Sequence, residues 1–146
     1  MPIAATCRLA EDVKIPYPEL VNLYGCKIDE DVFIGPFVEI QKNASVGQAS
    51  RVQSHAFICE GIHVGKRVFV GHGVMFINDR HPTANNLGWK LEKTFVEDDV
   101  SIGSGAIIMC GIRLGAGSRV GCGAVVTKDV PPGKTVVGVP ARVLRS

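Results

Sequence analysis

The chain has 146 residues, a formal net charge of +2 and 46% hydrophobic residues. This length suits one domain with a substantial core, and the small charge gives no electrostatic reason to expect nucleic-acid binding. No apolar run approaches the roughly 18 residues of a membrane span, and the N-terminus lacks a signal-peptide pattern. The five cysteines have no metal-ligand spacing. We therefore predict reduced thiols in a cytoplasmic protein without membrane insertion.

The N-terminal segment, residues 1–27, lacks a regular repeat and contains Pro2, Pro16 and Pro18. Proline cannot donate a ladder hydrogen bond, so this segment is expected to be irregular. We predict that it forms a cap over the structure that follows. Such a cap would protect an exposed sheet edge from pairing with other chains.

From residue 28 to the C-terminus an aliphatic or aromatic residue recurs every six positions, with one interruption. The recurring positions are Ile28, Ile34, Ile40, Val46, Val52, Ile58, Val64, Val70 and Phe76, then Val96, Ile102, Ile108, Leu114, Val120 and Val126. A small or branched residue four places after nearly every one points into the same core, because side chains alternate along a strand. The residues between must turn, and the glycine that often follows the aliphatic residue is expected to supply the necessary backbone freedom. This pattern predicts an all-β parallel solenoid in which each coil stacks on its neighbours.

The hexads Ile34–Glu39, Val70–Met75 and Ile102–Ile107 resemble those of the hexapeptide-repeat acyltransferases. The stretches Val120–Gly133 and Val136–Arg142 look like the C-terminal signature of acetyl-CoA-dependent members. The resemblance implies a left-handed parallel β-helix over residues 28–146. We expect no sizeable C-terminal helix, because the chain is shorter than the relatives that carry one. The resemblance also implies acetyl-CoA as cosubstrate, no metal, and a homotrimer with active sites between neighbouring subunits.

Three hexads form one coil in that family, so residues eighteen apart should stack on one face. One outward row contains Glu39 followed by Phe57, Met75, Ile107 and Val125. The four apolar members, here called the apolar ladder, predict a subunit contact because a monomer would expose them to water. Another outward row is expected to contain Ser45, His63, His81, Arg113 and Pro131, with the two histidines stacked.

The repeat breaks between Phe76 and Val96, which predicts a loop over residues 80–94. Such excursions commonly carry function. Asn78–Pro82 before the loop and Gly88–Lys90 within it resemble N-acetyltransferases that act on nucleotide-linked 3-amino sugars for surface polysaccharides. The resemblance implies that Asn78 and Asp79 orient the amine, that Asp79 could take its proton, and that Arg80, His81, Trp89 and Lys90 bind the substrate. Alternatively, Asn78 and Asp79 only initiate a turn.

Two histidines, His55 and His72, follow the same face on consecutive coils. Coils are separated by about 4.8 Å, so these side chains should lie close together. Either could accept a proton near neutral pH, and His55 is the preferred base because Ser54 and the apolar ladder lie beside it. They could equally be exposed corner residues. An amine nucleophile needs a base less than a hydroxyl does.

Seven residues are predicted to hold the coenzyme. The small residues that would allow its pantetheine arm to approach are Gly103, Ser104, Gly121 and Ala124, and the cations for its phosphates are Lys128, Lys134 and Arg142. Transfer of acetyl to a sugar or serine hydroxyl is the main alternative function. A zinc-dependent carbonic anhydrase-like protein and a non-enzymatic scaffold are weaker alternatives, since the four histidines show no close His-x4-His spacing.

Overall fold

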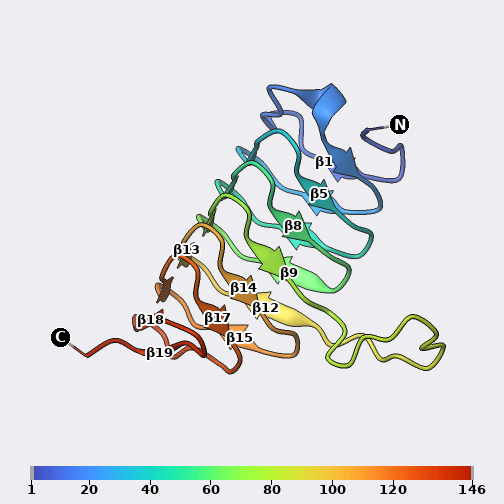
Figure 1. Cartoon of the computed structure of the whole chain (residues 1–146). Coiled ribbons are helices and arrows are strands. Elements are labelled where there is room, and N and C mark those ends of the chain that lie inside the picture. The colour runs from blue at the N-terminus through green and yellow to red at the C-terminus, as the bar shows by residue number, and fades with distance from the viewer. Residues whose placement is uncertain (1, 146) are drawn as a thin grey trace.

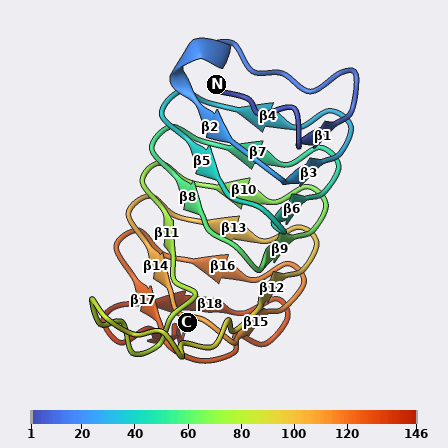
Figure 2. The ribbon, with the colours of Figure 1, turned by 90° about the vertical axis from the view of Figure 1, so that its right-hand side faces the viewer.

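The computed structural model describes residues 2–145, which wind into a three-sided parallel β-helix. Figures 1 and 2 show the coils stacked from the N-terminal end to the C-terminal end, with one long loop projecting between β11 and β12. Each strand has only two or three residues, and a tight corner follows it. The chain visits three sheets in a fixed order, here named C, A and B.

The three sheets contain strands from successive coils, as Figure 2 shows. Sheet A contains β2 (Asn22–Leu23), β5 (Glu39–Ile40), β8 (Phe57–Ile58), β11 (Met75–Phe76), β14 (Ile107–Ile108) and β17 (Val125–Val126). Sheet B contains β1 (Arg8–Leu9), β3 (Lys27–Ile28), β6 (Ser45–Val46), β9 (Ile62–Val64), β12 (Thr94–Val96) and β15 (Arg113–Leu114). Sheet C contains β4 (Phe33–Ile34), β7 (Arg51–Val52), β10 (Phe69–Val70), β13 (Ser101–Ile102), β16 (Arg119–Val120), β18 (Thr135–Val137) and β19 (Arg142–Val143).

The core lies inside the helix, along its axis. All fifteen predicted hexad positions from Ile28 to Val126 are buried, and Phe76 is the largest of them. Within residues 2–145 the only helical element is the short 3-10 turn η1 (Pro18–Leu20), and no helix there is long and apolar enough to cross a bilayer. The predicted fold class, a left-handed parallel β-helix with one extended loop and no sizeable C-terminal helix, is confirmed.

The role predicted for the recurrent glycines was wrong in one respect. The left-handed backbone conformation at each corner lies two residues further on, for example at Ala49 and at His55, where φ is +66°. Glycines such as Gly47 and Gly103 are needed because adjacent coils nearly touch. A Cβ added at Gly47 would lie 2.5 Å from the backbone of Gly65, and one at Gly103 would lie 2.6 Å from the Cys122 nitrogen.

Strand pairing extends into the N-terminal segment. β1 pairs in parallel with β3, and isolated bridges join Ile3 to Leu23 and Lys14 to Phe33. The first residues thus cover the edge of the first regular coil, which would otherwise expose unpaired backbone groups. We propose that this segment acts as the cap of the helix.

The outward row on sheet B differs from the prediction. Phe95 of β12 pairs with His63 and with Arg113, so it takes the place that we predicted for His81. The stacking of His63 on His81 was therefore a wrong prediction, because the long loop carries His81 out of the coil. The His63 ring stacks instead on Phe95, with ring centroids 5.3 Å apart.

The end of the same row also differs. Val130 bridges Leu114, which places Asp129 rather than Pro131 opposite Arg113. The Arg113 backbone N–H accordingly donates to Asp129 Oδ1 at 2.9 Å.

Two buried serines at equivalent corner positions, Ser50 and Ser118, provide a stability test. Ser50 Oγ donates to the Gly65 carbonyl at 2.9 Å and accepts from the Val68 N–H at 3.0 Å, whereas Ser118 Oγ has no hydrogen-bond partner among residues 2–145. An unpaired buried polar group is costly, so Ser118→Ala should be neutral or stabilising. Ser50→Ala should destabilise by about 1–3 kcal/mol, because the Val68 N–H loses its acceptor. Chemical denaturation measures both, and equal losses would contradict the argument.

Candidate active site

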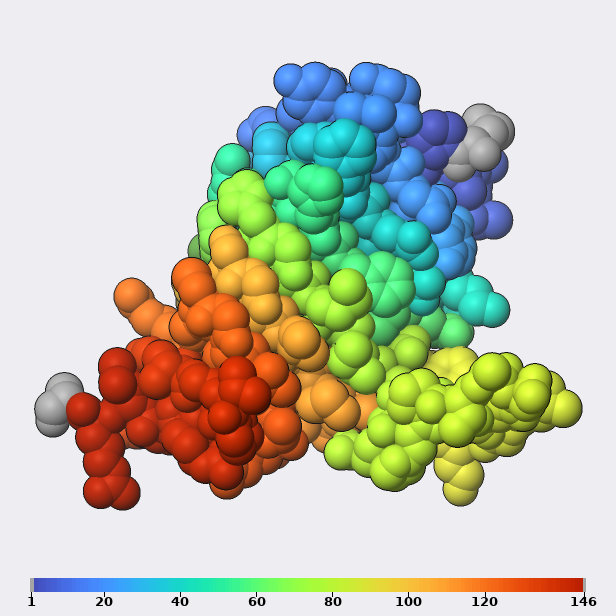
Figure 3. Space-filling view, viewed as in Figure 1, coloured from blue at the N-terminus to red at the C-terminus, as the bar shows by residue number. Residues whose placement is uncertain are grey.

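The apolar ladder forms the outer surface of sheet A. Strand register places Phe57 beside Met75, Met75 beside Ile107, and Ile107 beside Val125, so the predicted row is confirmed. Met75 is 39% exposed and Ile107 is 36% exposed. Figures 1 and 3 show that the long loop and the C-terminal segment project on opposite sides of the helix near its C-terminal end.

Two corners border sheet A, and each carries part of the predicted site. The C–A corner precedes each strand of sheet A and contains His55 and His72. The A–B corner follows each strand, and the long loop leaves the helix from it after Phe76. In one chain the apolar ladder therefore separates the two predicted groups of catalytic residues.

At the C–A corner, the two histidines lie on consecutive coils as predicted but make different contacts. His72 Nδ1 lies 2.9 Å from Ser54 Oγ, and this bond leaves the other ring nitrogen of an exposed side chain available. The His55 ring stacks on Phe37 with centroids 5.0 Å apart. The preferred partner of Ser54 is thus His72 rather than the neighbouring His55.

At the A–B corner, short hydrogen bonds orient Asn78 and Asp79. The Asn78 side-chain amide donates to the Glu60 carbonyl at 3.0 Å, which leaves its own carbonyl oxygen available to a ligand. Asp79 Oδ1 accepts from the His81 N–H at 3.1 Å, which is the turn-initiating arrangement considered above. The other carboxylate oxygen of Asp79 remains the one that a substrate could use.

The loop encloses a hollow of its own beside this corner. A cavity of about 320 Å³ is lined by five of the predicted residues, Asp79, Arg80, His81, Trp89 and Lys90, together with Asn86, Gly88 and Glu92. Trp89 is 40% exposed and offers an apolar surface among these polar groups. The structure therefore brings the predicted substrate-binding residues together.

An ion pair that the sequence did not predict closes the base of the loop. Arg80 binds both carboxylate oxygens of Glu92, with N–O distances of 3.1 and 3.0 Å, and also donates to the Cys110 carbonyl at 2.9 Å. The hydrogen bond from Arg80 lowers the pKa of Glu92. The guanidinium that we predicted to bind substrate is thus bonded within the chain. Glu92 lies outside the six-residue repeat, so no sequence pattern could indicate its role.

The ion pair between Arg80 and Glu92, here called the clamp, predicts a local effect of the substitution Glu92→Gln. The variant should keep the melting temperature of the wild type, because exposed ion pairs contribute little to global stability. Amide exchange in residues 82–91 should rise clearly, and the KM for the acceptor should rise on the order of tenfold as the loop residues lose their fixed positions. Exchange mass spectrometry and steady-state kinetics measure the two effects.

A matched control for this variant is Arg67→Gln. It removes another bidentate ion pair, between Arg67 and Asp99, on a corner remote from the loop. Arg67→Gln should change neither the amide exchange of the loop nor the KM for the acceptor. Unchanged loop exchange in Glu92→Gln would contradict the role of the clamp.

The residues predicted to hold the coenzyme fall into separate groups. Gly103, Ser104 and Gly121 lie on the C–A corner, the corner of the two histidines. A Cβ at Gly121 would lie 2.8 Å from Val137 Cγ1, so coil packing already requires a glycine there. Ala124 is fully buried, its N–H donates to the Gly121 carbonyl at 3.2 Å, and its carbonyl accepts from the Ile107 N–H at 2.8 Å, so the predicted coenzyme contact at Ala124 is not accessible in the single chain.

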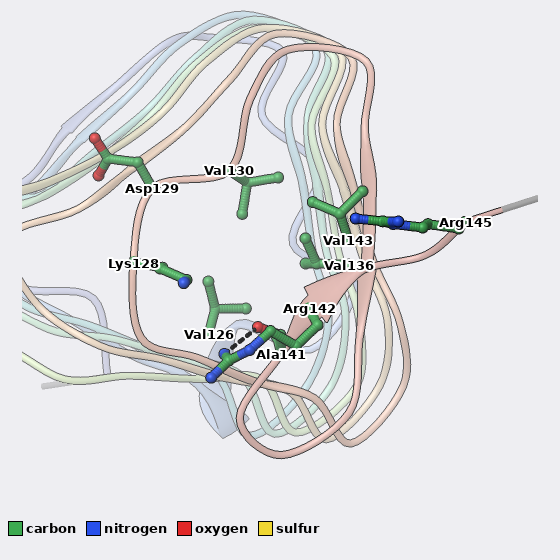
Figure 4. A pocket seen from close by; sticks show the side chains of 9 residues that line it. All are labelled: Val126, Lys128, Asp129, Val130, Val136, Ala141, Arg142, Val143 and Arg145. Atoms are coloured by element: carbon green, nitrogen blue, oxygen red, sulfur yellow. Dashed lines mark hydrogen bonds between the residues drawn. The ribbon is translucent and has the colours of Figure 1, made fainter.

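Two of the predicted cations lie at the C-terminal end of the helix. Lys128, Arg142 and Arg145 border a cavity of about 340 Å³ that also contacts Asp129, as Figure 4 shows. Buried Val126, Val130 and Val136 form its apolar wall. Arg142 Nη1 also donates to the Ala141 carbonyl at 2.9 Å. Lys134 does not line this cavity, whereas Arg145, which we did not predict, does.

The comparisons with known proteins agree with the repeated parallel β-helix. Residues 93–128 match the family model described as bacterial transferase hexapeptide (six repeats). The chain is 35% identical over 121 residues to the bifunctional protein GlmU of Rubrobacter xylanophilus, an alignment that covers 83% of this chain and 24% of that protein. The chain spans less than a third of the curated relatives it matches first.

Solved structures agree with the family match. A hexapeptide-repeat-containing acetyltransferase of Vibrio cholerae O1 biovar eltor, complexed with acetyl coenzyme A, is similar with a TM-score of 0.71 and 26% identity over 97% of this chain and 70% of that chain. A galactoside acetyltransferase in complex with coenzyme A is similar with a TM-score of 0.74 and 26% identity, over 83% of this chain and 64% of that one. The chain contains hexapeptide repeats, and its resemblance to hexapeptide-repeat acyltransferases is confirmed.

Proposed function

We propose that this chain transfers acetyl from acetyl-CoA to the amino group of a nucleotide-linked amino-deoxy sugar. A 3-amino sugar is the favoured acceptor, and the proposed setting is the synthesis of surface polysaccharide in the cytoplasm. Structural similarity to acetyltransferases that hold acetyl-CoA or coenzyme A supports the acetyl donor. The motif Asn78–Pro82, which borders the loop hollow, supports the amino-sugar acceptor.

The observation that carries the proposal is the position of the two candidate half-sites on either side of one apolar face. His55 and His72 border sheet A on one side, and Asn78 and Asp79 border it on the other. An exposed apolar row between two polar groups is the expected appearance of a subunit contact. We propose a homotrimer in which the C–A corner of one subunit meets the A–B corner of its neighbour.

The proposed reaction needs a neutral amine, a polarised thioester and a fixed angle of attack. The sugar nitrogen forms a bond to the acetyl carbon, the bond from that carbon to sulfur breaks, and the amine loses one proton. The free carbonyl oxygen of Asn78 is suited to accept a hydrogen bond from the amine and hold it. His55 of the neighbouring subunit, or the free oxygen of Asp79, takes the proton. Coenzyme A leaves as a thiolate.

The cations at the C-terminal end are the proposed contacts of the coenzyme phosphates. Lys128 and Arg142 border the same cavity, and arginine can hold a phosphate through two parallel hydrogen bonds. The small residues Ser104 and Gly121 on the C–A corner would then face the pantetheine arm. Lys134 lies away from this cavity and would contact the coenzyme only from another subunit.

Transfer to a hydroxyl is the second candidate, and two observations favour it. The acceptor named for one similar structure is a galactoside. The bond between Ser54 and His72 also holds an imidazole in one orientation, which suits a base that must activate a hydroxyl. In this case the histidine would be indispensable.

The test is thiol release from acetyl-CoA with a panel of acceptors. The panel contains nucleotide-linked 3-amino and 4-amino sugars, their hydroxyl counterparts, a galactoside and serine. Turnover with the amines alone would support the proposal and identify the sugar. Equal or faster turnover with a hydroxyl counterpart would replace it with O-acetylation.

A further inference from the structure

A second groove lies on the outer side of sheet B and reaches the A–B corner through Asn43 and Gly61, next to the Glu60 carbonyl that holds Asn78. It has a volume of about 620 Å³, the largest of the cavities described for residues 2–145, and it falls in the size range of small-ligand sites. The N-terminal segment forms one end through Thr6 and Arg8, and the returning loop forms the other through Leu91 and Lys93. None of the residues proposed for acetyl transfer lines this groove.

The charged residues that line the groove are all basic. Arg8, Lys27 and Lys93 line it, and no aspartate or glutamate is among its lining residues. The nearest carboxylates bind at its border: Asp29 lies 3.9 Å from Lys27 Nζ, and Glu60 accepts from Asn43 Nδ2 at 3.0 Å. Arg8 lies beside Lys27 on neighbouring strands, and Lys93 immediately precedes β12 at the other end of the groove, so the cations are distributed along its length.

Polar groups at the floor complete the site. His63 Nδ1 lies 2.8 Å from Ser45 Oγ, and stacking on Phe95 fixes the plane of the ring. Burial, and after it the positive charge of Lys93, lowers the pKa of His63. The ring thereby offers its second nitrogen, and Asn43 and Thr6 add further polar atoms at the rim.

We propose that this groove binds a phosphate or pyrophosphate group. Phosphate oxygens take charge-assisted hydrogen bonds from arginine and lysine, and these contacts strengthen where no carboxylate competes. The group could belong to a nucleoside diphosphate, to coenzyme A or to a free anion. In each case the chemistry that Arg8, Lys27 and Lys93 recognise is the same.

Calorimetric titration of the full chain with inorganic pyrophosphate, thymidine diphosphate and coenzyme A tests the proposal. Lys27→Gln/Lys93→Gln should weaken binding of the groove ligand by about tenfold or more, since two charge-assisted contacts are lost. Lys14→Gln/Lys66→Gln changes the charge equally at positions outside the groove and should leave binding unchanged. In the wild type, the imidazole NMR signals of His63 should shift on binding.

The three probes separate the source of the phosphate. Tighter binding of thymidine diphosphate would assign the groove to a nucleotide, tighter binding of coenzyme A would assign it to the coenzyme, and binding of pyrophosphate alone would assign it to a free anion. Each outcome supports a phosphate site in the groove only when Lys27→Gln/Lys93→Gln weakens that binding, because the coenzyme and the nucleotide also have proposed contacts elsewhere. No saturable binding, unchanged binding in Lys27→Gln/Lys93→Gln, or equal weakening in both double variants would overturn the proposal. These readouts require no turnover, so they stand apart from the proposed acetyl transfer.

Discussion

Met75→Glu is expected to convert the proposed homotrimer into monomers and to abolish most of the proposed activity. Met75 lies in the middle of the apolar ladder and is 39% exposed in the isolated chain. Burial of an unpaired carboxylate in an apolar contact costs several kcal/mol, so association should weaken by at least about 100-fold. Light scattering after gel filtration measures the assembly, and thiol release measures the activity.

A matched control is Phe69→Glu. Phe69 is 40% exposed, also points outward, and lies in the same coil, but on sheet C. The control should keep both the assembly and the activity. Loss of assembly in Phe69→Glu but not in Met75→Glu would place the contact on sheet C, and a monomeric wild type would refute the ladder contact altogether.

Mixed assemblies of two inactive variants are expected to recover activity. His55→Gly removes the imidazole at a position where φ is +66°, which glycine adopts without strain. Asn78→Ala removes the amide that is held by the Glu60 carbonyl. Each variant alone should lose about 100-fold or more in kcat/KM, because each disables every site of the proposed trimer.

Co-refolding the two variants in equal amounts restores intact sites at some interfaces. A site needs His55 from one subunit and Asn78 from the next. In an equal mixture, each of these two subunits carries the required residue with a probability of one half. About one quarter of the interfaces should therefore be active. Mixtures of separately refolded variants, which cannot exchange subunits quickly, provide the control. No recovery after co-refolding would show that both residues act within one chain or that neither belongs to the site.

The periodic part of the structure could be predicted closely from the sequence. Each coil repeats the same packing problem, so the aliphatic residues from Ile28 to Val126 fix which side chains point inward and which stack. The row from Phe57 to Val125 followed from that spacing together with the three-hexad coil that the family resemblance implied. The spacing did not distinguish the two roles of glycine. Close contact between coils and a left-handed backbone conformation both favour glycine.

The loop and the ends could be predicted less well. Residues 77–93 leave the repeat, so spacing cannot indicate that Arg80 and Glu92 meet or that Cys110 lies beside them. The loop also ends slightly earlier than predicted, since Thr94 already belongs to β12. His81 was misplaced for the same reason. The groove on sheet B depends on the path of the N-terminal segment, which has no regular repeat.

The proposed function depends on acetyl reaching a nitrogen. It is tested with acetyl-CoA labelled in the acetyl group and the nucleotide-linked 3-amino sugar as acceptor, followed by treatment of the isolated product with alkaline hydroxylamine, which cleaves oxygen esters. An amide resists this reagent, so we expect the label to stay on the sugar. Release of the label would reveal an ester and contradict N-acetylation, and failure of the label to reach the sugar at all would contradict the proposed acceptor.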